Sequence, residues 1–431
     1  MHTIIHGDCL EELKKLDDNS VDAVITDPPY GLSNTKPKQV ADVLKAWVTG
    51  DTVSVPAKRG GFMGKDWDSF VPPPAVWQEC MRVLKPGGHM AVFAGARTQD
   101  LMGLSIRLAG FEIRDTLGWV YGSGFPKSMD VSKAIDKAAG AEREVVGVGA
   151  AYCSWIERGE KCQGHADSGK SQSGDTIHSP ATAPATSEAQ RWDGWGTALK
   201  PAIEPIILAR KPLDGTVANN VLAHGVGGLN IDACRVPGAK PDTTRGASVN
   251  ASSMAGPLGG QGRITDDGKG RFPANVLLDE HAAKEMDKQS GVGVSRASTK
   301  RNGKDEAQAT WGLRRTEDTL RGHNDSGGAS RFFPVFKYQA KAPKKERPVI
   351  EREDGTKIQH NTVKPLALME WLVSLIVPPG GVVLDPFAGS GTTLQAALNK
   401  GFRPIGIEAD ADYIQLIHQR MEGGEQSTRS S

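Results

Sequence analysis

One segment near the C-terminal end constrains the fold of this chain more than any other. It begins at residue 382 and reads Val-Val-Leu-Asp-Pro-Phe-Ala-Gly-Ser-Gly-Thr-Thr, a buried-strand pattern that ends in a glycine-rich turn and opens a helix. Gly389 and Gly391 let the backbone approach a ligand closely, and the helix start offers unpaired amides. Glu408 follows Asp385 by twenty-three positions, at the end of the next expected strand, which suits a carboxylate that accepts from ribose hydroxyls. The segment therefore predicts an α/β fold with a nucleotide-type ligand at its strand ends.

The ligand expected at this turn need not be a dinucleotide. The turn lacks the third glycine of the dinucleotide fingerprint and the lysine of a phosphate-binding loop. A nucleoside with a small charged tail fits the turn better. The alternative, a tight turn without a ligand, does not account for the acid that follows at the next strand end.

Alternating strand and helix patterns flank a long central segment of different character. Strand patterns alternate with helical ones, which is typical of parallel strands joined by crossover helices. The expected strands cover residues 21–25, 89–93, 111–121, 381–384 and 403–407, and the expected helices cover residues 77–84, 366–377, 394–399 and 412–421. Lys85-Pro-Gly-Gly is expected to end the first of these helices.

The central segment is rich in Gly, Ser, Thr and Pro and predicts an insertion with its own role. We expect mobile loops at residues 163–190 and 237–263, because these stretches contain few large apolar side chains. The predicted boundaries are residues 1–124 for a first α/β half, 125–336 for the insertion, 337–424 for a second α/β half and 425–431 for a tail.

The composition sets limits on the class of protein. The chain is 38% hydrophobic and 24% charged, which is usual for a globular protein in water. The first residues lack a basic stretch followed by an apolar run, and no apolar run approaches the length of a membrane span, so we expect a cytoplasmic protein that does not enter membranes. Five scattered cysteines fit a reducing compartment better than a disulfide framework.

The residues Asp27-Pro-Pro-Tyr30 follow the first expected strand and suit chemistry on an aromatic amino group. The lone pair of such a nitrogen is delocalised into its ring, so catalysis must return electron density to it. The carboxylate of Asp27 and the carbonyl of Pro28 can accept its two hydrogens, and Pro28 and Pro29 stiffen the turn. Tyr30 offers a flat face for an extruded base. Taken alone, the four residues also fit a rigid surface turn.

The two motifs in this order resemble a known family, the amino-group DNA methyltransferases of the β arrangement. In that family the Asp-Pro-Pro-Tyr half comes first, a target-recognition region follows, and the cofactor loop comes last. The middle of the chain is also similar to prophage and bacterial orphan methylases around Tyr121-Gly-Ser-Gly, Gly227-Gly-Leu-Asn and Gly270-Arg-Phe-Pro. The resemblance implies a Rossmann-like fold with a seven-stranded mixed sheet, circularly permuted, that carries a large inserted target-recognition region. It also implies S-adenosylmethionine as cofactor, double-stranded DNA as substrate and a homodimer.

The resemblance assigns roles to individual residues. It implies catalysis by Asp27, Pro28, Pro29 and Tyr30 on a flipped base. Lys364 is expected to bind the carboxylate of the cofactor, Phe387 to face its sulfonium, and Glu408 to bind its ribose. The full set of cofactor contacts that it implies is Asp8, Thr362, Lys364, Asp385, Phe387, Gly389, Ser390, Gly391, Thr392 and Glu408.

A basic segment predicts where DNA is bound. Residues 296–347 contain thirteen Lys or Arg against six Asp or Glu, in a chain of net charge +1. This excess favours a phosphate-facing surface, with a solvated charged loop as the alternative. The expected DNA contacts are Arg314, Arg315, Lys337, Lys341, Lys344 and Lys345.

Several alternatives stay open at this stage. Adenine N6 is favoured over cytosine N4, because family members that methylate cytosine more often carry Ser at the position of Asp27. A protein that keeps the fold and DNA binding without turnover, and a restriction enzyme with a fused nuclease, are weaker alternatives. The spacing of Cys153, Cys162, His165 and His178 does not match a zinc finger, so no metal is expected. Trp192 and Trp195 fit DNA stacking or buried anchors equally well.

Overall fold

The structure, a computed structural model, divides the chain into two compact units. The larger unit comprises Met1–Gly122 and Ile203–Ser431, and the smaller unit comprises Ser123–Ala202. The residues that the structure describes are 2–33, 35–56, 68–122, 124, 128–148, 180–238, 243–244, 263–264, 270–295, 325–336, 347–352, 354–360 and 362–428.

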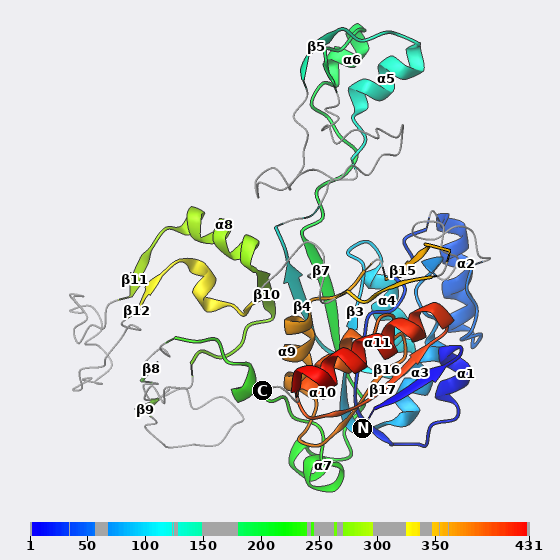
Figure 1. Ribbon diagram of the computed structural model, residues 1–431, viewed down its shortest axis with the longest axis vertical. Coiled ribbons are helices and arrows are strands. Elements are labelled where there is room, and N and C mark those ends of the chain that lie inside the picture. Colours follow the sequence, from blue (N-terminus) through cyan, green and yellow to red (C-terminus); the bar gives the residue numbers. More distant parts are fainter. Residues whose placement is uncertain are drawn as a thin grey trace, which may run out of the picture. The chain divides into compact units, whose positions relative to one another are not determined.

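A nine-stranded sheet forms the centre of the larger unit (Figure 1). All neighbouring strands are parallel except that β7 runs antiparallel to both of its neighbours, β3 and β4. In spatial order the strands are β1 (Thr3–His6), β17 (Arg403–Glu408), β16 (Val382–Asp385), β2 (Val21–Thr26), β3 (Leu84–Phe93), β7 (Ile203–Arg210), β4 (Glu112–Val120), β10 (Val276–Asp279) and β13 (Val335–Phe336). The sheet confirms the predicted Rossmann-like α/β class with one antiparallel strand. It has nine strands rather than seven because β10 and β13 extend it beyond β4.

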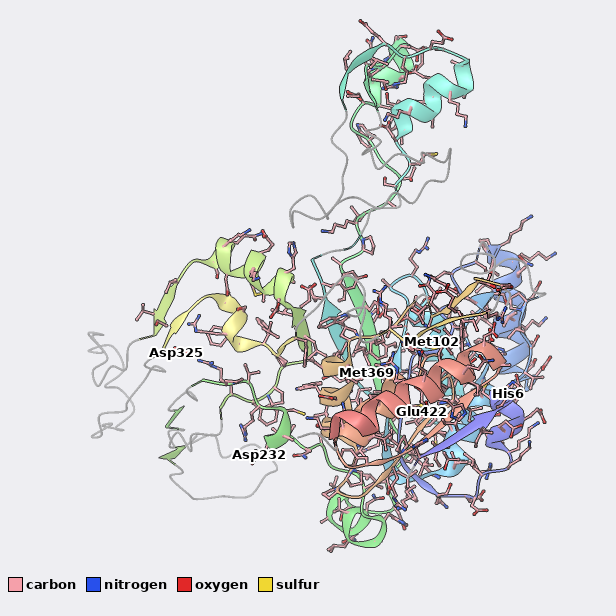
Figure 2. All side chains as sticks on the ribbon, in the orientation of Figure 1. His6, Met102, Asp232, Asp325, Met369 and Glu422 are labelled. Carbon is pink, nitrogen blue, oxygen red and sulfur yellow. The ribbon has the colours of Figure 1, made fainter. Side chains whose placement is uncertain are left out.

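Helices cover both faces of this sheet, so its central strands are buried on both sides. Every residue of β2 is buried, and alternate side chains enter different cores, with Val24 in one and Ile25 in the other. Met102 of α4 and Met369 of α9, both labelled in Figure 2, are buried in these two cores. One face carries α1 (Cys9–Leu13), α2 (Pro37–Val48), α3 (Pro74–Val83) and α4 (Gln99–Leu108), and the other carries α9 (Leu366–Ile376), α10 (Thr392–Asn399) and α11 (Ala411–Thr428). Burial on both faces explains the near-continuous apolar runs of these strands.

Two sequence predictions about this sheet need correction. The strand expected at residues 89–93 begins at Leu84, because Leu84 pairs with Val21 and a register shift lets Lys85-Pro-Gly-Gly lie within β3. The insertion predicted at residues 125–336 is not continuous, because β7, β10 and β13 from within it pair into the main sheet. Short apolar runs in the insertion are therefore strands of the main sheet, and the antiparallel strand β7 lies near its centre.

The remaining elements of the larger unit are short and lie outside the sheet. A buried ion pair joins Arg271 to Asp325, and Asp287 of α8 accepts from the backbone and hydroxyl of Ser330. The hydrogen bonds of Asp287 tie α8 to the 3-10 helix after β12. The elements are α7 (Val217–His224), η4 (Asp232–Cys234), α8 (Glu280–Ser290), η6 (Ala329–Phe332) and the paired strands β8 (Thr243–Thr244) with β9 (Arg263–Ile264), β11 (Gly293–Ser295) with β12 (Asp325–Gly327) and β14 (Val349–Glu351) with β15 (Lys357–Gln359).

A buried carboxylate links several segments of the smaller unit. Asp136 accepts from the backbone amides of Ala185 and Thr186, from the Thr186 hydroxyl and from Arg143. Its elements are α5 (Val131–Ala139), β5 (Val145–Val148), β6 (Pro180–Thr182) and α6 (Ser187–Arg191). The mobile loop predicted at residues 163–190 is therefore wrong for its last part, because Asp136 supplies polar partners that order residues 180–190 despite their few apolar side chains.

Several other predictions concern the smaller unit or undescribed parts of the chain. Trp192 and Trp195 contact each other edge to face and are 44% and 60% exposed, so they are not buried anchors. Cys153, Cys162, His165 and His178, and most of the loop predicted at residues 237–263, lie outside the described residues. Within the described ranges, no three His, Cys, Asp or Glu side chains are grouped to hold a metal. None of the helices in those ranges combines the length and apolarity of a bilayer span.

Candidate active site

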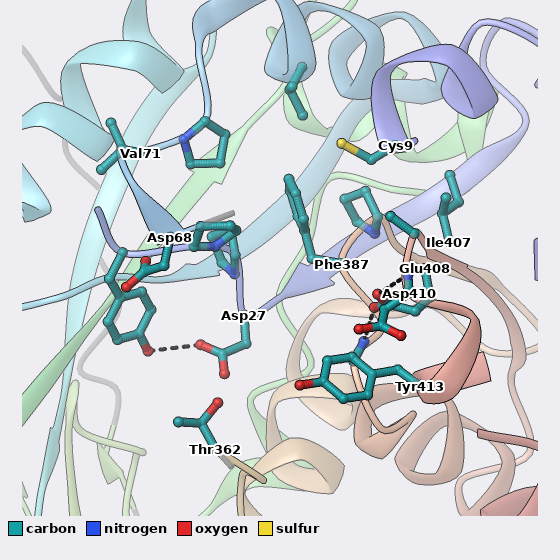
Figure 3. A pocket seen from close by; sticks show the side chains of 18 of the residues that line it. Cys9, Asp27, Asp68, Val71, Thr362, Phe387, Ile407, Glu408, Asp410 and Tyr413 are labelled. Carbon is teal, nitrogen blue, oxygen red and sulfur yellow. Dashed lines mark hydrogen bonds between the residues drawn. The ribbon is translucent and has the colours of Figure 1, made fainter. Parts of the chain in front are cut away.

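The carboxyl ends of β2, β16 and β17 meet at one edge of the parallel sheet, where a cavity of about 700 Å³ opens. Ligands bind at this edge in open α/β sheets because the loops that follow the strands converge there. Figure 3 shows Asp27 and Thr362 toward one end of the cavity and Glu408, Asp410 and Tyr413 toward the other, with Phe387 between them. Both predicted motifs therefore line one cavity.

The Asp27-Pro-Pro-Tyr30 turn follows directly on β2. Tyr30 donates from its hydroxyl to Asp27 Oδ1 over 2.8 Å, and all four residues of the turn line the cavity. Burial raises the pKa of Asp27, and the nearby charge of Lys364 opposes that shift. The turn thus presents a carboxylate that is largely withdrawn from water, with 20% of its side chain exposed.

Lys364 reaches the end of the cavity that holds Asp27 and Tyr30. Its ammonium nitrogen lies 3.2 Å from Asp27 Oδ2, 2.9 Å from the Tyr30 hydroxyl and 2.8 Å from Glu204 Oε2. Burial acts to lower its pKa, but the carboxylates of Asp27 and Glu204 raise it above the usual value, so the amine is charged. The resemblance placed Lys364 on the cofactor carboxylate, whereas the structure places it against Asp27.

Glu204 is a site residue that the sequence did not reveal. It occupies the second position of β7 and pairs with Trp119 of β4, and its side chain lines the cavity. The only available signal was one acid at the start of the apolar run of residues 203–210. Local patterns could not assign that acid to the site, because β7 reaches it through pairing between β3 and β4.

Hydrogen bonds of Asp385 and two glycines with positive φ determine the conformation of the glycine-rich turn after β16. Asp385 Oδ1 accepts from the Thr26 hydroxyl over 2.6 Å and from the Phe387 amide over 3.1 Å, and burial raises the Asp385 pKa to about 6. Gly389 has a φ of +53°, and a Cβ there would lie 3.0 Å from His360 Nε2. Gly391, with a φ of +79°, begins α10. The turn therefore requires glycine where it approaches the cavity.

A buried arginine supports the same turn from behind. Arg420 of α11 donates from Nε to the Ser390 carbonyl over 2.6 Å. Ser390 and Thr392 are themselves buried, and both border a small recess beside Gly389. Their positions fit a role in building the turn.

Glu408 ends β17 at the opposite side of the cavity from Asp27. Its Oε2 accepts from the Gly389 amide over 2.8 Å and its Oε1 from the Asp410 amide over 2.9 Å. Burial raises the Glu408 pKa to about 7. Asp8 lines the cavity nearby and caps α1 through the Leu10 amide. Two of the predicted cofactor acids therefore lie at one end of the cavity.

His360, Asp410 and Tyr413 also line this end and were missing from the predicted set. The His360 ring packs edge to face on Tyr413 with 4.6 Å between centroids, and the Thr362 amide donates to His360 Nδ1. Burial lowers the His360 pKa to about 4, so the ring is neutral. The predicted DNA contacts cannot be compared in this way, since Arg314, Arg315, Lys337, Lys341, Lys344 and Lys345 all lie outside the described residues.

The parallel sheet, the glycine turn and the acid that ends the next strand define a Rossmann-like methyltransferase. The chain belongs to the DNA methylase family of N6/N4 methyltransferases, whose sequence pattern matches residues 21–146 and 165–419. Its cofactor is S-adenosylmethionine, and its activity is methyl transfer to DNA.

The chain is also similar to named relatives and to a solved structure. Type II methyltransferase M.HindIII of Haemophilus influenzae is 24% identical over 441 residues, which cover 97% of this chain and 94% of that one. DNA adenine methyltransferase YhdJ of Escherichia coli is 43% identical over 63 residues, which cover 15% of this chain and 21% of that one. The Thermus thermophilus modification methylase TTHA0409, solved with S-adenosylmethionine, is 17% identical with a TM-score of 0.38, and the alignment covers 98% of this chain and 96% of that one.

Proposed function

We propose that the protein is a site-specific DNA methyltransferase that transfers a methyl group to the N6 amino group of an adenine flipped out of duplex DNA. The observation that carries this proposal is the placement of Asp27. Its largely buried carboxylate lies in the same cavity as the glycine turn and Glu408. A carboxylate acceptor and a nucleoside-type pocket in one cavity are what amino methylation requires.

The residues of the cavity fit the cofactor. The absence of a Cβ at Gly389 leaves room beside its amide, and Glu408 keeps lone pairs available beyond its two backbone contacts. Glu408 would accept from the ribose hydroxyls, Phe387 would contact the sulfonium, and Gly389 would allow close approach of the backbone. When bound, S-adenosylmethionine supplies an electrophilic methyl group.

The chain's own residues then act on the base. Asp27 and the Pro28 carbonyl accept from the amino group, which increases electron density on its nitrogen. Tyr30 offers its ring as a stacking surface worth about 1–3 kcal/mol, comparable with the few kcal/mol that extrusion costs. Positioning and prearranged charge supply the rate, so no covalent enzyme intermediate is needed.

Two observations favour adenine over cytosine as the target. Asp27 carries the carboxylate at the position where family members that act on cytosine more often have serine. The local relative YhdJ is named as an adenine methyltransferase. N4 methylation of cytosine is the second candidate, since its amino group makes the same demands on Asp27.

We also propose partners and a cellular site for this activity. The basic segment at residues 296–347 would bind DNA phosphates. The exposed side chains of Trp192 and Trp195, in the smaller unit, would contact DNA bases. The enzyme would work as a homodimer on chromosomal DNA in the cytoplasm. A monomeric mass in light scattering, both free and on DNA, would contradict the dimer.

The test is mass spectrometry of nucleosides from unmethylated DNA incubated with the protein and S-adenosylmethionine. N6-methyladenine formed by the unchanged protein and absent with Asp27→Ala is the expected result. Asp17→Ala is a matched control, because Asp17 lies outside the lining of the cavity. N4-methylcytosine would overturn the base assignment, and bound cofactor without any methylated base would overturn catalysis. Sequencing of the modified DNA then maps the target site.

A further inference from the structure

Glu204 and Lys364 form an ion pair at the base end of the cavity that the motifs do not explain. The ammonium of Lys364 contacts Glu204, Tyr30 and Asp27 within 3.2 Å, and its nitrogen lies 4.8 Å from the centroid of the Phe93 ring. A lysine has three N–H donors, so these three oxygen partners use all of them. The ammonium is therefore fixed beside the carboxylate that is expected to bind the base.

Entry of a base amino group would change one of these contacts, the one between Lys364 and Asp27. An amino N–H that donates to Asp27 competes with Lys364 for the same carboxylate. The contact with Glu204 is the shortest of the three, at 2.8 Å, and keeps the ammonium in place. One lysine donor is then released at the edge of the base that carries the amino group.

We propose that Lys364, positioned by Glu204, recognises the target base by donating a hydrogen bond to the ring nitrogen beside the amino group. This inference rests on the proposed function and adds residues that select the base. Adenine and cytosine both place an acceptor nitrogen next to an amino donor, whereas thymine places an N–H next to a carbonyl. The Asp27 acceptor and the Lys364 donor therefore match adenine and cytosine and oppose thymine.

Charge explains why Glu204 is needed in addition to Lys364. Methyl transfer creates positive charge on the amino nitrogen, which a lone ammonium nearby would oppose. Two carboxylates, Asp27 and Glu204, surround the one ammonium, so the ionised cluster carries a net negative charge. Glu204 thus acts as a positioning residue that also offsets the lysine charge in a cavity where charges are weakly screened.

The experiment compares duplexes that carry adenine or 1-deazaadenine at the mapped target site. The deaza base replaces the acceptor nitrogen N1 with C–H and keeps the amino group. The unchanged protein should methylate and bind the adenine duplex at least about tenfold better, as expected for loss of a hydrogen bond to a charged group. Binding is measured with S-adenosylhomocysteine, so the readout does not depend on turnover. Lys364→Met should methylate and bind the two duplexes equally well. An intrinsic difference between the two bases affects both proteins alike, so it cancels when the preference of the variant is compared with that of the unchanged protein.

Two further variants make the outcome decisive. Glu204→Gln keeps Lys364 but weakens the contact that positions its ammonium, so the preference for the adenine duplex should fall to less than about threefold. This variant tests the inference even if Lys364→Met does not fold. Lys85→Met is the matched control, because Lys85 pairs with the buried Asp22 over 2.6 Å outside the cavity lining, and it should keep the full preference. Equal methylation and binding of both duplexes by the unchanged protein would overturn this inference alone. No methylation of either duplex would overturn the proposed function and this inference with it.

Discussion

The two oxygens of Glu408 each accept one backbone hydrogen bond, from Gly389 and from Asp410. These contacts orient the carboxylate and leave further acceptor capacity on both oxygens. Burial raises its pKa from 4.5 to about 7, so both protonation states are populated near neutral pH. In the proposed function the ionised form accepts from both ribose hydroxyls, and protonation turns one of its oxygens into a donor, so cofactor binding should depend on pH.

We expect cofactor affinity to fall as the pH drops through about 7. Protonation removes an acceptor, so the dissociation constant should rise by about tenfold per pH unit well below the pKa and level off above it. Isothermal titration calorimetry with S-adenosylmethionine between pH 5.5 and 8.5, an interval of about three units around this pKa, measures the effect. Glu408→Gln should bind weakly with little pH dependence. A flat profile for the unchanged protein would exclude Glu408 as the group that controls binding.

Gly389 is expected to be essential for ligand approach as well as for backbone conformation. Gly389→Ala places a Cβ at a φ of +53°, 3.0 Å from His360 Nε2. Gly401→Ala is a matched control, since Gly401 has a φ of +77° and open space around the added Cβ. Each substitution should cost about 1 kcal/mol of unfolding free energy because of the left-handed backbone. Only Gly389→Ala should weaken cofactor binding, which denaturant unfolding and calorimetry together test. Equal loss of binding in both variants would refute a special role for Gly389.

Helix α11 contacts the glycine turn through two buried side chains. Arg420 donates to the Ser390 carbonyl, and Ile417 of the same helix packs where a side chain at Gly391 would lie. The helix therefore limits the turn from the side away from the cavity. A turn held in this way keeps the Gly389 amide on Glu408 before any ligand binds.

Arg420→Met should weaken cofactor binding by about tenfold, because an unpaired carbonyl at Ser390 lets the turn relax. Arg403→Met is a matched control, since Arg403 donates from Nε to the Gly380 carbonyl at the opposite end of β16. That control should bind the cofactor normally. Hydrogen exchange at residues 386–391 should increase in Arg420→Met alone. Unchanged exchange there, together with normal affinity, would show that the turn holds its own shape.

Sequence patterns predicted the elements of this sheet better than its connections. Continuous apolar runs predicted β2 and β16, because strands buried on both faces leave that local signal. They did not predict that β7 enters between β3 and β4, since the pairing joins residues about one hundred positions apart. Glu204 was missed for this reason. The partners of Lys364 were missed as well, because its side chain meets Asp27 only in the folded chain.

The cavity and the exposed tryptophans belong to different units of the chain. The described residues that line the cavity all belong to the larger unit, whereas Trp192 and Trp195 belong to the smaller one. The described residues of the smaller unit bury few apolar side chains, and a polar network around Asp136 joins its segments. We therefore expect that a substitution which unfolds the smaller unit leaves the structure of the cavity unchanged.

Asp136→Asn tests this independence. An amide presents N–H groups where the carboxylate accepts from Ala185, Thr186 and Arg143, so buried donors would face each other or lose partners. Hydrogen exchange should accelerate at residues 128–148 and 180–202, while the strands of the larger unit and the cofactor affinity stay unchanged. Asp130→Asn is the matched control, because Asp130 caps α5 through the Lys133 amide and asparagine caps equally well. Its exchange should match that of the unchanged protein. Faster exchange in β2 and β16 of Asp136→Asn would show that the sheet depends on the smaller unit and that the two units unfold together.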